Sequence, residues 1–213
     1  MPLRDVELAG SLGPRRLWVQ GRPSSRCLVF LDGEHYVERV DAPAIVPDGV
    51  TAVYLSFGDP EQRRVDLCCN DAFADYLALE LVPWLQATIG PRAQLTLCGL
   101  SLSGLAAIHA ALRHPDVFDR VISQSPSAWW NDEWLFGNLP SGPGLDARVS
   151  VGAHETAEHV DHGHPDLFQV TSQVDSCRNL VAGLRRQGHG VDYVEFEGGH
   201  DAESWRDDLR AAL

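Results

Sequence analysis

The sequence predicts an α/β fold, with a mostly parallel central sheet and helices on both of its faces. Short apolar runs alternate along the chain with longer segments in which apolar residues recur at helical spacing. This alternation is typical of parallel strands joined by crossover helices. The chain has 213 residues, 44% of them hydrophobic, which is enough for one sizeable core but not comfortably for two. No linker-like stretch divides it, so we expect one domain over residues 1–213.

Six apolar runs are the expected strands of the parallel part of the sheet. RCLVFLDG is a continuous apolar run that ends in Asp-Gly, which suits a buried strand and its exit turn. The six runs are RCLVFLDG (26–33), TAVYLSF (51–57), QLTLCG (94–99), VFDRVISQSP (117–126), ARVSVGA (147–153) and VDYVEFEGG (191–199). Residues 3–9 and 15–20 are expected to form a leading hairpin.

Four segments with helical spacing lie between and after these strands. Asn70 can cap the first, which should run to about Ile89 and either kink or enter its last turn at Pro83. The other three are expected over 102–113, 170–187 and 203–213. The stretch that joins the fourth and fifth parallel strands is too short for a lid domain, so we expect an open pocket.

Net charge and composition exclude several classes of partner. The chain carries a net charge of −13, and all 17 of its basic residues are arginine, so nucleic acid and anionic membranes are not expected as partners. No stretch approaches the roughly 18 apolar residues of a membrane span, and the N-terminal MPLRDVELAG has no signal-peptide core. The five cysteines are odd in number and irregularly spaced, which indicates reduced thiols in a cytoplasmic protein.

CGLSLSG (98–104) predicts a sharp turn between a strand and a helix, the context in which α/β-hydrolases present a nucleophilic serine. The turn is so tight that the residues two before and two after the nucleophile nearly touch, and both must be small. Around Ser101 these neighbours are Gly99 and Ser103. Around Ser103 the second neighbour would be Leu105, which would clash. Ser101 is therefore the expected nucleophile. The alternative is a turn whose serines only cap the helix and take no part in a reaction.

A nucleophilic serine needs a base and an acid, which follow it in that fold in the order Ser, acid, His. His200 lies just past the last expected strand and is the expected base, a surface histidine that caps the final helix being the alternative. The acid should follow the preceding strand, where Glu155 is the first candidate. Three other carboxylates of that loop stay open as alternatives: Glu158, Asp161 and Asp166.

An oxyanion hole requires two backbone donors. One is the N–H of the residue after the nucleophile, Leu102. The other should come from the loop after an early strand, and LDGEHY (31–36) supplies the N–H of Gly33 or Glu34.

The sequence resembles a known family over most of the chain after about residue 26. The matching stretches are VFLDGEHY (29–36), RRVDLCCNDAF and LELVPWL (63–73 and 79–85), CGLSLSGLAAIHAALRHPDVFDRVISQSPSAWW (98–130) and VEFEGGHDAESWRDDL (194–209). They are similar to the esterase group of α/β hydrolases that contains the enterochelin (enterobactin) esterases, with S-formylglutathione hydrolases and feruloyl esterases as more distant relatives.

The resemblance implies an ester substrate, no cofactor, and roles for three residues: Ser101 as nucleophile, His200 as base, and the acid at or near Glu155. Ser103 stands where the family has a second glycine. Its hydroxyl therefore either projects toward the pocket, as a substrate-binding group, or bonds locally.

Further substrate-binding candidates flank these motifs. Trp129 and Trp130, with Trp134, are expected either to form an aromatic wall or to anchor their loop. Arg63 and Arg64 are candidates to bind an anionic substrate group, with surface solvation as the alternative.

The histidine-rich stretch at 154–164 is not expected to bind a metal. HETAEH spaces its histidines five apart, and a helix would not present both on one face as H-E-x-x-H does. A mobile polar loop is expected there.

The sequence therefore predicts a serine hydrolase that cleaves a small-molecule carboxylic ester through an acyl-enzyme, most specifically a siderophore esterase of the enterobactin type. The alternatives are an aryl, feruloyl, acetyl or small-acyl esterase, an acyltransferase of the same fold, or a ligand-binding module without turnover. The sequence leaves the oligomeric state open.

Overall fold

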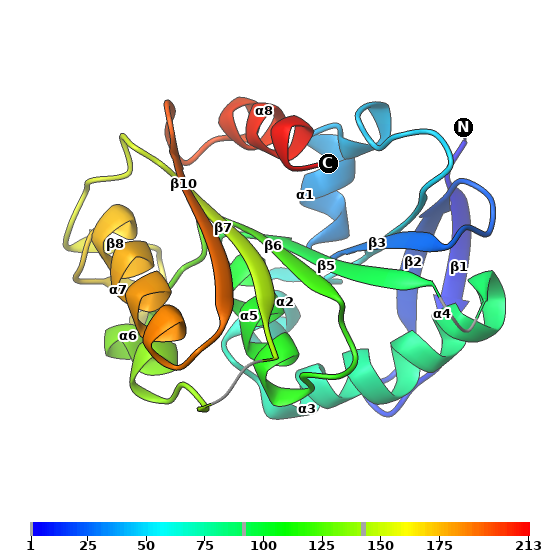
Figure 1. Ribbon diagram of the computed structural model, residues 1–213, viewed down its shortest axis with the longest axis horizontal. Coiled ribbons are helices and arrows are strands. Elements are labelled where there is room, and N and C mark those ends of the chain that lie inside the picture. The colour runs from blue at the N-terminus through cyan, green and yellow to red at the C-terminus, as the bar shows by residue number, and fades with distance from the viewer. Residues whose placement is uncertain (1, 91–92, 142–143) are drawn as a thin grey trace.

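The computed structural model describes residues 2–90, 93–141 and 144–213 and is built on a twisted central sheet (Figure 1). Across the sheet the strand order is β1-β2-β4-β3-β5-β6-β7-β10. The strands are β1 (Arg4–Leu8), β2 (Arg15–Gln20), β3 (Arg26–Phe30), β4 (Thr51–Leu55), β5 (Gln94–Leu100), β6 (Arg120–Gln124), β7 (Asp146–Gly152) and β10 (Gly190–Phe196). β2 pairs antiparallel with β1 and β4, and all other pairs are parallel, which confirms the mostly parallel α/β sheet.

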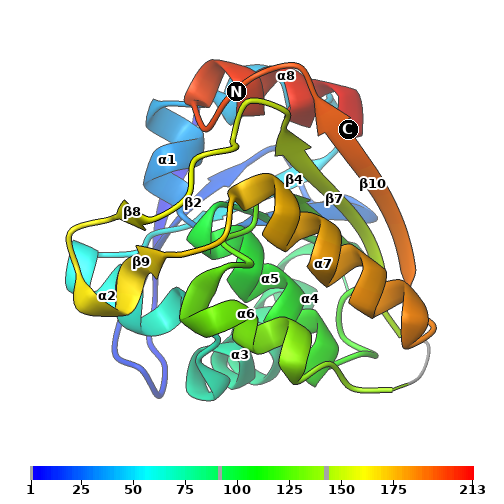
Figure 2. The same cartoon turned by 90° about the vertical axis from the view of Figure 1, so that its left-hand side faces the viewer.

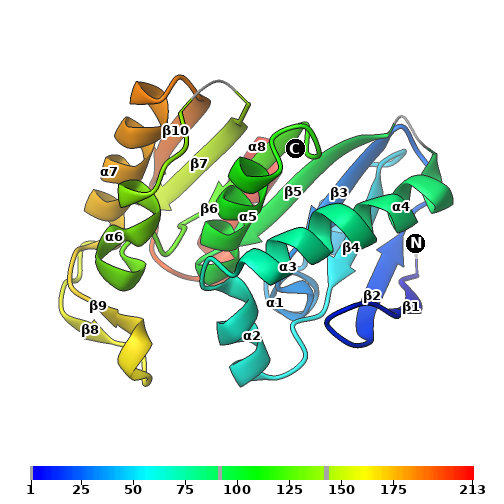
Figure 3. The same ribbon diagram turned by 90° about the horizontal axis from the view of Figure 1, so that it is seen from below.

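Helices cover both faces of the sheet, as expected. α1 (Gly33–Glu38) and α8 (Ala202–Ala212) lie on one face, above the sheet in Figure 1. Figure 3 shows the other face, which carries α2 (Pro60–Leu67), α3 (Asp71–Tyr76), α4 (Val82–Ile89), α5 (Leu102–Arg113), α6 (Trp130–Gly137) and α7 (Gln173–Arg186). Among the described residues no helix combines the length and the apolar character needed to cross a membrane.

The continuous apolar runs follow from burial on both faces of the sheet. In β3, Val29 packs into the larger core beneath α2 to α7, whereas Leu28 and Phe30 pack into the smaller core beneath α1 and α8. Since side chains alternate between the faces of a strand, a strand covered on both sides needs apolar residues at every position.

Three short helices, α1, α2 and α6, were not expected from the sequence, because six or eight residues show too little periodicity. Asp59 caps α2 by accepting a hydrogen bond from the Gln62 N–H at 2.8 Å. The helix expected over 70–89 is interrupted by a π-helical turn, Leu77–Leu81, and Pro83 is the second residue of α4, directly after that turn. Ser172 caps α7, so this helix begins at Gln173 rather than at residue 170.

The segment between β7 and α7, expected as a mobile polar loop, contains secondary structure. It contains β8 (Val160–Asp161) and β9 (Phe168–Gln169), which pair antiparallel around a 3-10 turn, Pro165–Leu167. Figure 2 shows this pair beside α2, well away from the central sheet. An ion pair between Arg64 and Asp166, with Nη1 and Oδ2 2.9 Å apart, joins it to α2.

Candidate active site

A cavity of about 490 Å³ opens at the carboxyl edge of the parallel strands, where α/β sheets ordinarily bind ligands. Its lining comes from the turn after β5, the loop after β6, the segment between β7 and α7, the loop before α8, and one residue each of α2 and α7. The lining residues are Arg63, Ser101, Leu102, Ser127, Trp129, His154, Glu155, Ala157, Val160, His162, Leu167, Gln169, Gln173 and His200.

Ser101 occupies the sharp turn between β5 and α5 with φ 52° and ψ −121°, a conformation that a non-glycine residue rarely adopts. The turn is so tight that a Cβ on Gly99 would lie 2.1 Å from the carbonyl oxygen of Ser103. Two backbone bonds hold it against the end of β6: Ser101 N–H donates to the Gln124 carbonyl at 2.8 Å, and the Ser101 carbonyl accepts from Ser127 N–H at 3.0 Å. The surrounding bonds therefore maintain the strain.

Ser103 does not reach the cavity, contrary to its place among the expected substrate-binding residues. It is fully buried, and its hydroxyl donates to the Leu100 carbonyl at 2.7 Å and accepts from the Leu100 N–H at 2.9 Å. Both bonds close the turn from inside. The hydroxyl at this position therefore serves the backbone and not the pocket.

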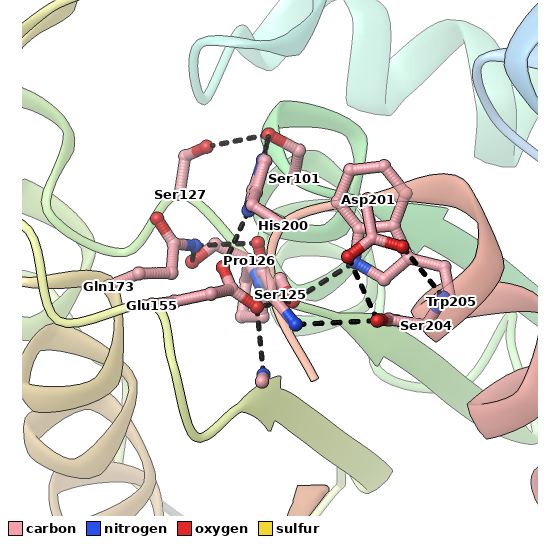
Figure 4. Close-up of polar contacts among 12 residues, drawn as sticks. Ser101, Ser125, Pro126, Ser127, Glu155, Gln173, His200, Asp201, Ser204 and Trp205 are labelled. Carbon is pink, nitrogen blue, oxygen red and sulfur yellow. Dashed lines mark hydrogen bonds and ion pairs between the residues drawn. The ribbon is translucent and has the colours of Figure 1, made fainter. Parts of the chain in front are cut away.

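His200 bridges Ser101 and Glu155 (Figure 4). Its Nε2 lies 3.0 Å from the Ser101 hydroxyl oxygen, and its Nδ1 lies 2.5 Å from Oε2 of Glu155. The Glu155 side chain is almost wholly buried, whereas 40% of the His200 side chain is exposed. The three residues follow one another in the chain in the order Ser, acid, His, and their contacts form a continuous chain. This is the arrangement that activates the serine in serine hydrolases.

The other carboxylates of the 153–172 segment lie elsewhere. Glu158 is exposed, Asp161 accepts from the Gly163 N–H at 2.8 Å, and Asp166 pairs with Arg64. Of the four candidates, only Glu155 contacts His200.

Three residues that the sequence did not single out touch this chain of hydrogen bonds. The Ser127 hydroxyl lies 3.3 Å from that of Ser101. The Ser125 hydroxyl donates to Oε1 of Glu155 at 2.6 Å and accepts from the indole N–H of Trp205 at 3.0 Å. The sequence did contain a signal, since SQSPS follows a strand that adjoins the nucleophile's strand, but using it required the strand order.

Two backbone oxyanion donors were expected, the N–H of Leu102 and that of either Gly33 or Glu34. Leu102 and Gly33 are the first residues of α5 and α1, so their N–H groups have no acceptor within their helices. Leu102 lines the cavity, whereas Gly33 and Glu34 lie one strand away, after the end of β3. Gly33 is required there, because a Cβ would lie 2.9 Å from the Leu55 carbonyl oxygen.

The two neighbouring arginines differ in their placement. Arg63 lines the cavity and donates from Nε and Nη2 to the carboxylate of Asp32, at 2.7 and 2.6 Å. Burial alone would raise the pKa of Asp32, but hydrogen bonds and charge from His35 and Arg63 hold it below its ordinary value. Arg64, expected as a substrate-binding residue, instead pairs with Glu61 and Asp166 and does not line the cavity.

The two tryptophans expected in the pocket, Trp129 and Trp130, also differ in their placement. Trp129 lines the cavity, donates from Nε1 to Oε1 of Gln173 at 2.5 Å, and stacks on His162 with ring centroids 4.9 Å apart and planes 8° apart. Trp130 packs edge-to-face on Trp134 and against the larger core, so it anchors its loop and forms no pocket wall. The Trp129–His162 stack is the aromatic wall of the cavity, with half of it supplied by the segment after β7.

The histidines of that segment are occupied separately. His162 contacts Oε1 of Gln169 at 3.0 Å, and His154 pairs with Glu197 at 2.7 Å. Within residues 2–90, 93–141 and 144–213, no three His, Cys, Asp or Glu side chains come together in a way that would hold a metal ion.

Comparison with known families and proteins gives a consistent picture. Residues 32–213 match the family described as "Putative esterase". The iron(III) enterobactin esterase of Dickeya dadantii is 28% identical over 92% of this chain and 50% of that protein. The iron(III) enterobactin esterase of Escherichia coli K12 is 28% identical over 93% of this chain and 52% of that protein. The chain thus spans about half the length of these relatives.

Solved structures share its fold. The enterobactin esterase FES from Shigella flexneri, solved in the presence of enterobactin, superposes with a TM-score of 0.76 at 23% identity, over 99% of this chain and 58% of that chain. The siderophore hydrolase EstA from Aspergillus nidulans superposes with a TM-score of 0.69 at 17% identity, over 99% of this chain and 94% of that chain. Both likenesses are to the α/β-hydrolase fold.

Proposed function

Because this chain belongs to the "Putative esterase" family, we propose that it hydrolyses carboxylic esters through an acyl-enzyme formed on Ser101. The observation that carries the proposal is the continuous contact from Glu155 to His200 to Ser101, at 2.5 and 3.0 Å. A strained turn presents that serine at the floor of a cavity, and the acid behind the base is buried.

In the proposed reaction, His200 Nε2 takes the proton of Ser101 as its oxygen attacks the ester carbonyl. Glu155 accepts the Nδ1–H bond, which keeps the imidazole in the tautomer whose Nε2 is free to act as a base. The developing oxyanion is stabilised by the Leu102 N–H and by a second donor from Gly33 or Glu34. His200 then protonates the leaving alcohol, and a water molecule that it activates releases the acid.

The substrate class we propose is a siderophore ester. Esterases named for enterobactin account for both curated relatives described above, and they match this chain over more than nine-tenths of its length. The cavity supports the proposal, because it pairs a flat aromatic wall, Trp129 on His162, with the guanidinium of Arg63. Planar, electron-rich acyl groups fit such a lining.

We further propose that residues 1–213 act as one esterase domain. The odd number and irregular spacing of the cysteines support a reducing, cytoplasmic setting for its reaction.

Covalent labelling tests the enzymatic part of this proposal. A fluorophosphonate probe should label the wild-type chain and the Ser103→Gly variant but not Ser101→Ala, since only Ser101 contacts the base. Labelling that survives in Ser101→Ala would contradict the choice of nucleophile. Absence of labelling in the folded wild type would favour a ligand-binding module.

Turnover tests the substrate class. We expect a catecholate trilactone, free or ferric, to give a higher kcat/KM than p-nitrophenyl acetate or a feruloyl ester. Activity confined to short acyl esters would remove the siderophore part of the proposal and leave the esterase part standing. Product analysis with an added alcohol separates hydrolysis from acyl transfer.

A further inference from the structure

Ser125, in the loop after β6, contacts Glu155, and Trp205, on α8, contacts Ser125. Neither residue belongs to the chain of Ser101, His200 and Glu155 described above. We propose that Ser125 and Trp205 are positioning residues of this site, forming a relay from indole to hydroxyl to carboxylate that fixes Glu155 against His200. The proposal rests on the esterase activity proposed above and deepens it.

The backbone holds the Ser125 hydroxyl in place. Ser125 is fully buried, with φ 42°, and its N–H donates to the Ser150 carbonyl at 2.6 Å. Its own carbonyl accepts from Nε2 of Gln173 at 2.6 Å. These two bonds fix the backbone of Ser125, and its hydroxyl is engaged by Glu155 and Trp205.

The direction of the relay follows from the chemistry of its donors. An indole N–H can only donate, so the Ser125 oxygen must accept from Trp205, and its single proton goes to Oε1 of Glu155. Gly152 N–H donates to the same Oε1 at 2.8 Å. With Oε1 engaged by two donors, Oε2 is the oxygen left for Nδ1 of His200.

One local turn places both Trp205 and His200. Asp201, next in the chain after His200, caps α8 by accepting from the Ser204 N–H at 2.9 Å, and its carbonyl accepts from the Trp205 N–H at 3.1 Å. This first helical turn brings the indole back over the imidazole, edge-to-face with centroids 4.6 Å apart (Figure 4). Trp205 therefore packs against the base and, through Ser125, bonds to the acid.

The relay has a chemical consequence besides geometry. Donors on Oε1 draw the negative charge of Glu155 away from Oε2. Without the Ser125 hydroxyl, more of the negative charge faces Nδ1 and stabilises protonated His200. As the pH is lowered, the variant should therefore lose activity at a higher pH than the wild type does. The other charged or titratable groups near His200 are Asp201, Arg63, His154 and His162, none of which the substitutions below change.

The test is the pH dependence of kcat/KM for p-nitrophenyl acetate in Ser125→Ala, Ser125→Gly and Trp205→Phe. Glycine tolerates φ 42° without strain, so Ser125→Gly removes the hydroxyl while keeping the backbone. Both Ser125 variants should lower kcat about tenfold and move the acid limb to higher pH. Trp205→Phe should move the limb in the same direction by less, whereas Trp84→Phe on α4, outside the site, should not move it.

A double-mutant cycle checks that the indole acts through the hydroxyl. Trp205→Phe should cost little further activity in the Ser125→Gly background, because its acceptor is already gone. Equal costs in both backgrounds, or an acid limb of Ser125→Gly that coincides with that of the wild type, would overturn the relay. Fluorophosphonate labelling of the wild type keeps the two proposals apart: labelling without a limb shift refutes the relay alone, and no labelling refutes the esterase.

Discussion

Ser101 and Glu155 are held in the site by different means. Ser101 is placed by its backbone: a strained φ, a glycine two residues before it and hydrogen bonds from main chain to main chain. Glu155 is placed by hydrogen bonds to its side chain, one of them from Ser125, thirty residues away in the chain. A position fixed by backbone sterics tolerates no extra atom, whereas a position fixed by side-chain bonds can be weakened one bond at a time.

Gly99→Ala disrupts the backbone turn that holds Ser101 and should have the largest effect. The new Cβ would lie 2.1 Å from the Ser103 carbonyl oxygen, so the turn must open and move the Ser101 oxygen from His200. We expect loss of at least about 100-fold in kcat/KM and a free energy of unfolding lower by about 2 to 3 kcal/mol. Denaturant titration and p-nitrophenyl acetate turnover measure the two effects.

Gly137→Ala is the matched control for this prediction, because a Cβ at Gly137 meets no atom within 4 Å. It should leave both quantities close to wild type. Full activity of Gly99→Ala would show that the turn is not as rigid as its geometry indicates.

Glu155→Gln removes the charge of the residue that is held by side-chain hydrogen bonds, without changing its size. The neutral amide removes the charge that stabilises protonated His200 and allows the wrong imidazole tautomer, so kcat should fall about 100-fold to 10,000-fold with the fold intact. Steady-state kinetics with circular dichroism measures this. Glu158→Gln, in the same loop but exposed, should retain full activity. Full activity in Glu155→Gln would point to a different acid.

His162→Asn removes half of the aromatic wall and leaves the Ser101–His200–Glu155 contacts intact. An aromatic stack contributes about 0.5 to 1.5 kcal/mol, so KM for an aryl ester should rise about 2-fold to 10-fold with little change in kcat. His159→Asn, exposed in the same segment, is the control. A fall in kcat with unchanged KM would mean that His162 contributes to the chemical step instead of binding.

Arg64→Gln should have the smallest effect. It breaks the ion pairs with Glu61 and Asp166, whose side chains are 67% and 59% exposed, and such pairs contribute about 0 to 1 kcal/mol. The free energy of unfolding should change by less than about 1 kcal/mol, comparably to Arg210→Gln, which breaks another exposed pair. A rise in KM as large as that in His162→Asn would show that the ion pair between Arg64 and Asp166 keeps the aromatic wall of the cavity in position.

The contrast between the two kinds of support also explains how much could be predicted. The turn at Ser101 could be predicted because consecutive residues determine it. His200 and Glu155 could be placed near it because each follows a strand that ends at the same edge of the sheet. Ser125, Ser127 and Trp205 were missed because their contacts depend on side-chain directions in the segments after β5, β6 and β7 and in the first turn of α8. Trp130 and Arg64 were wrongly assigned to the pocket because sequence proximity to Trp129 and Arg63 does not determine which side chain faces it.

The anchoring of α8 bears on how the site is assembled during folding. Buried Asp208 on α8 accepts from Nη2 of Arg148 at 2.6 Å and from Nε2 of Gln124 at 2.8 Å, which joins the helix to β7 and β6. His200, just before this helix, lies 99 positions in the chain from Ser101, which it contacts. Closing so long a span costs chain entropy, and contacts of this kind form late. In the proposed mechanism, a partly folded chain would therefore lack the contact between His200 and Ser101, and Ser101 would become reactive only in the completed fold.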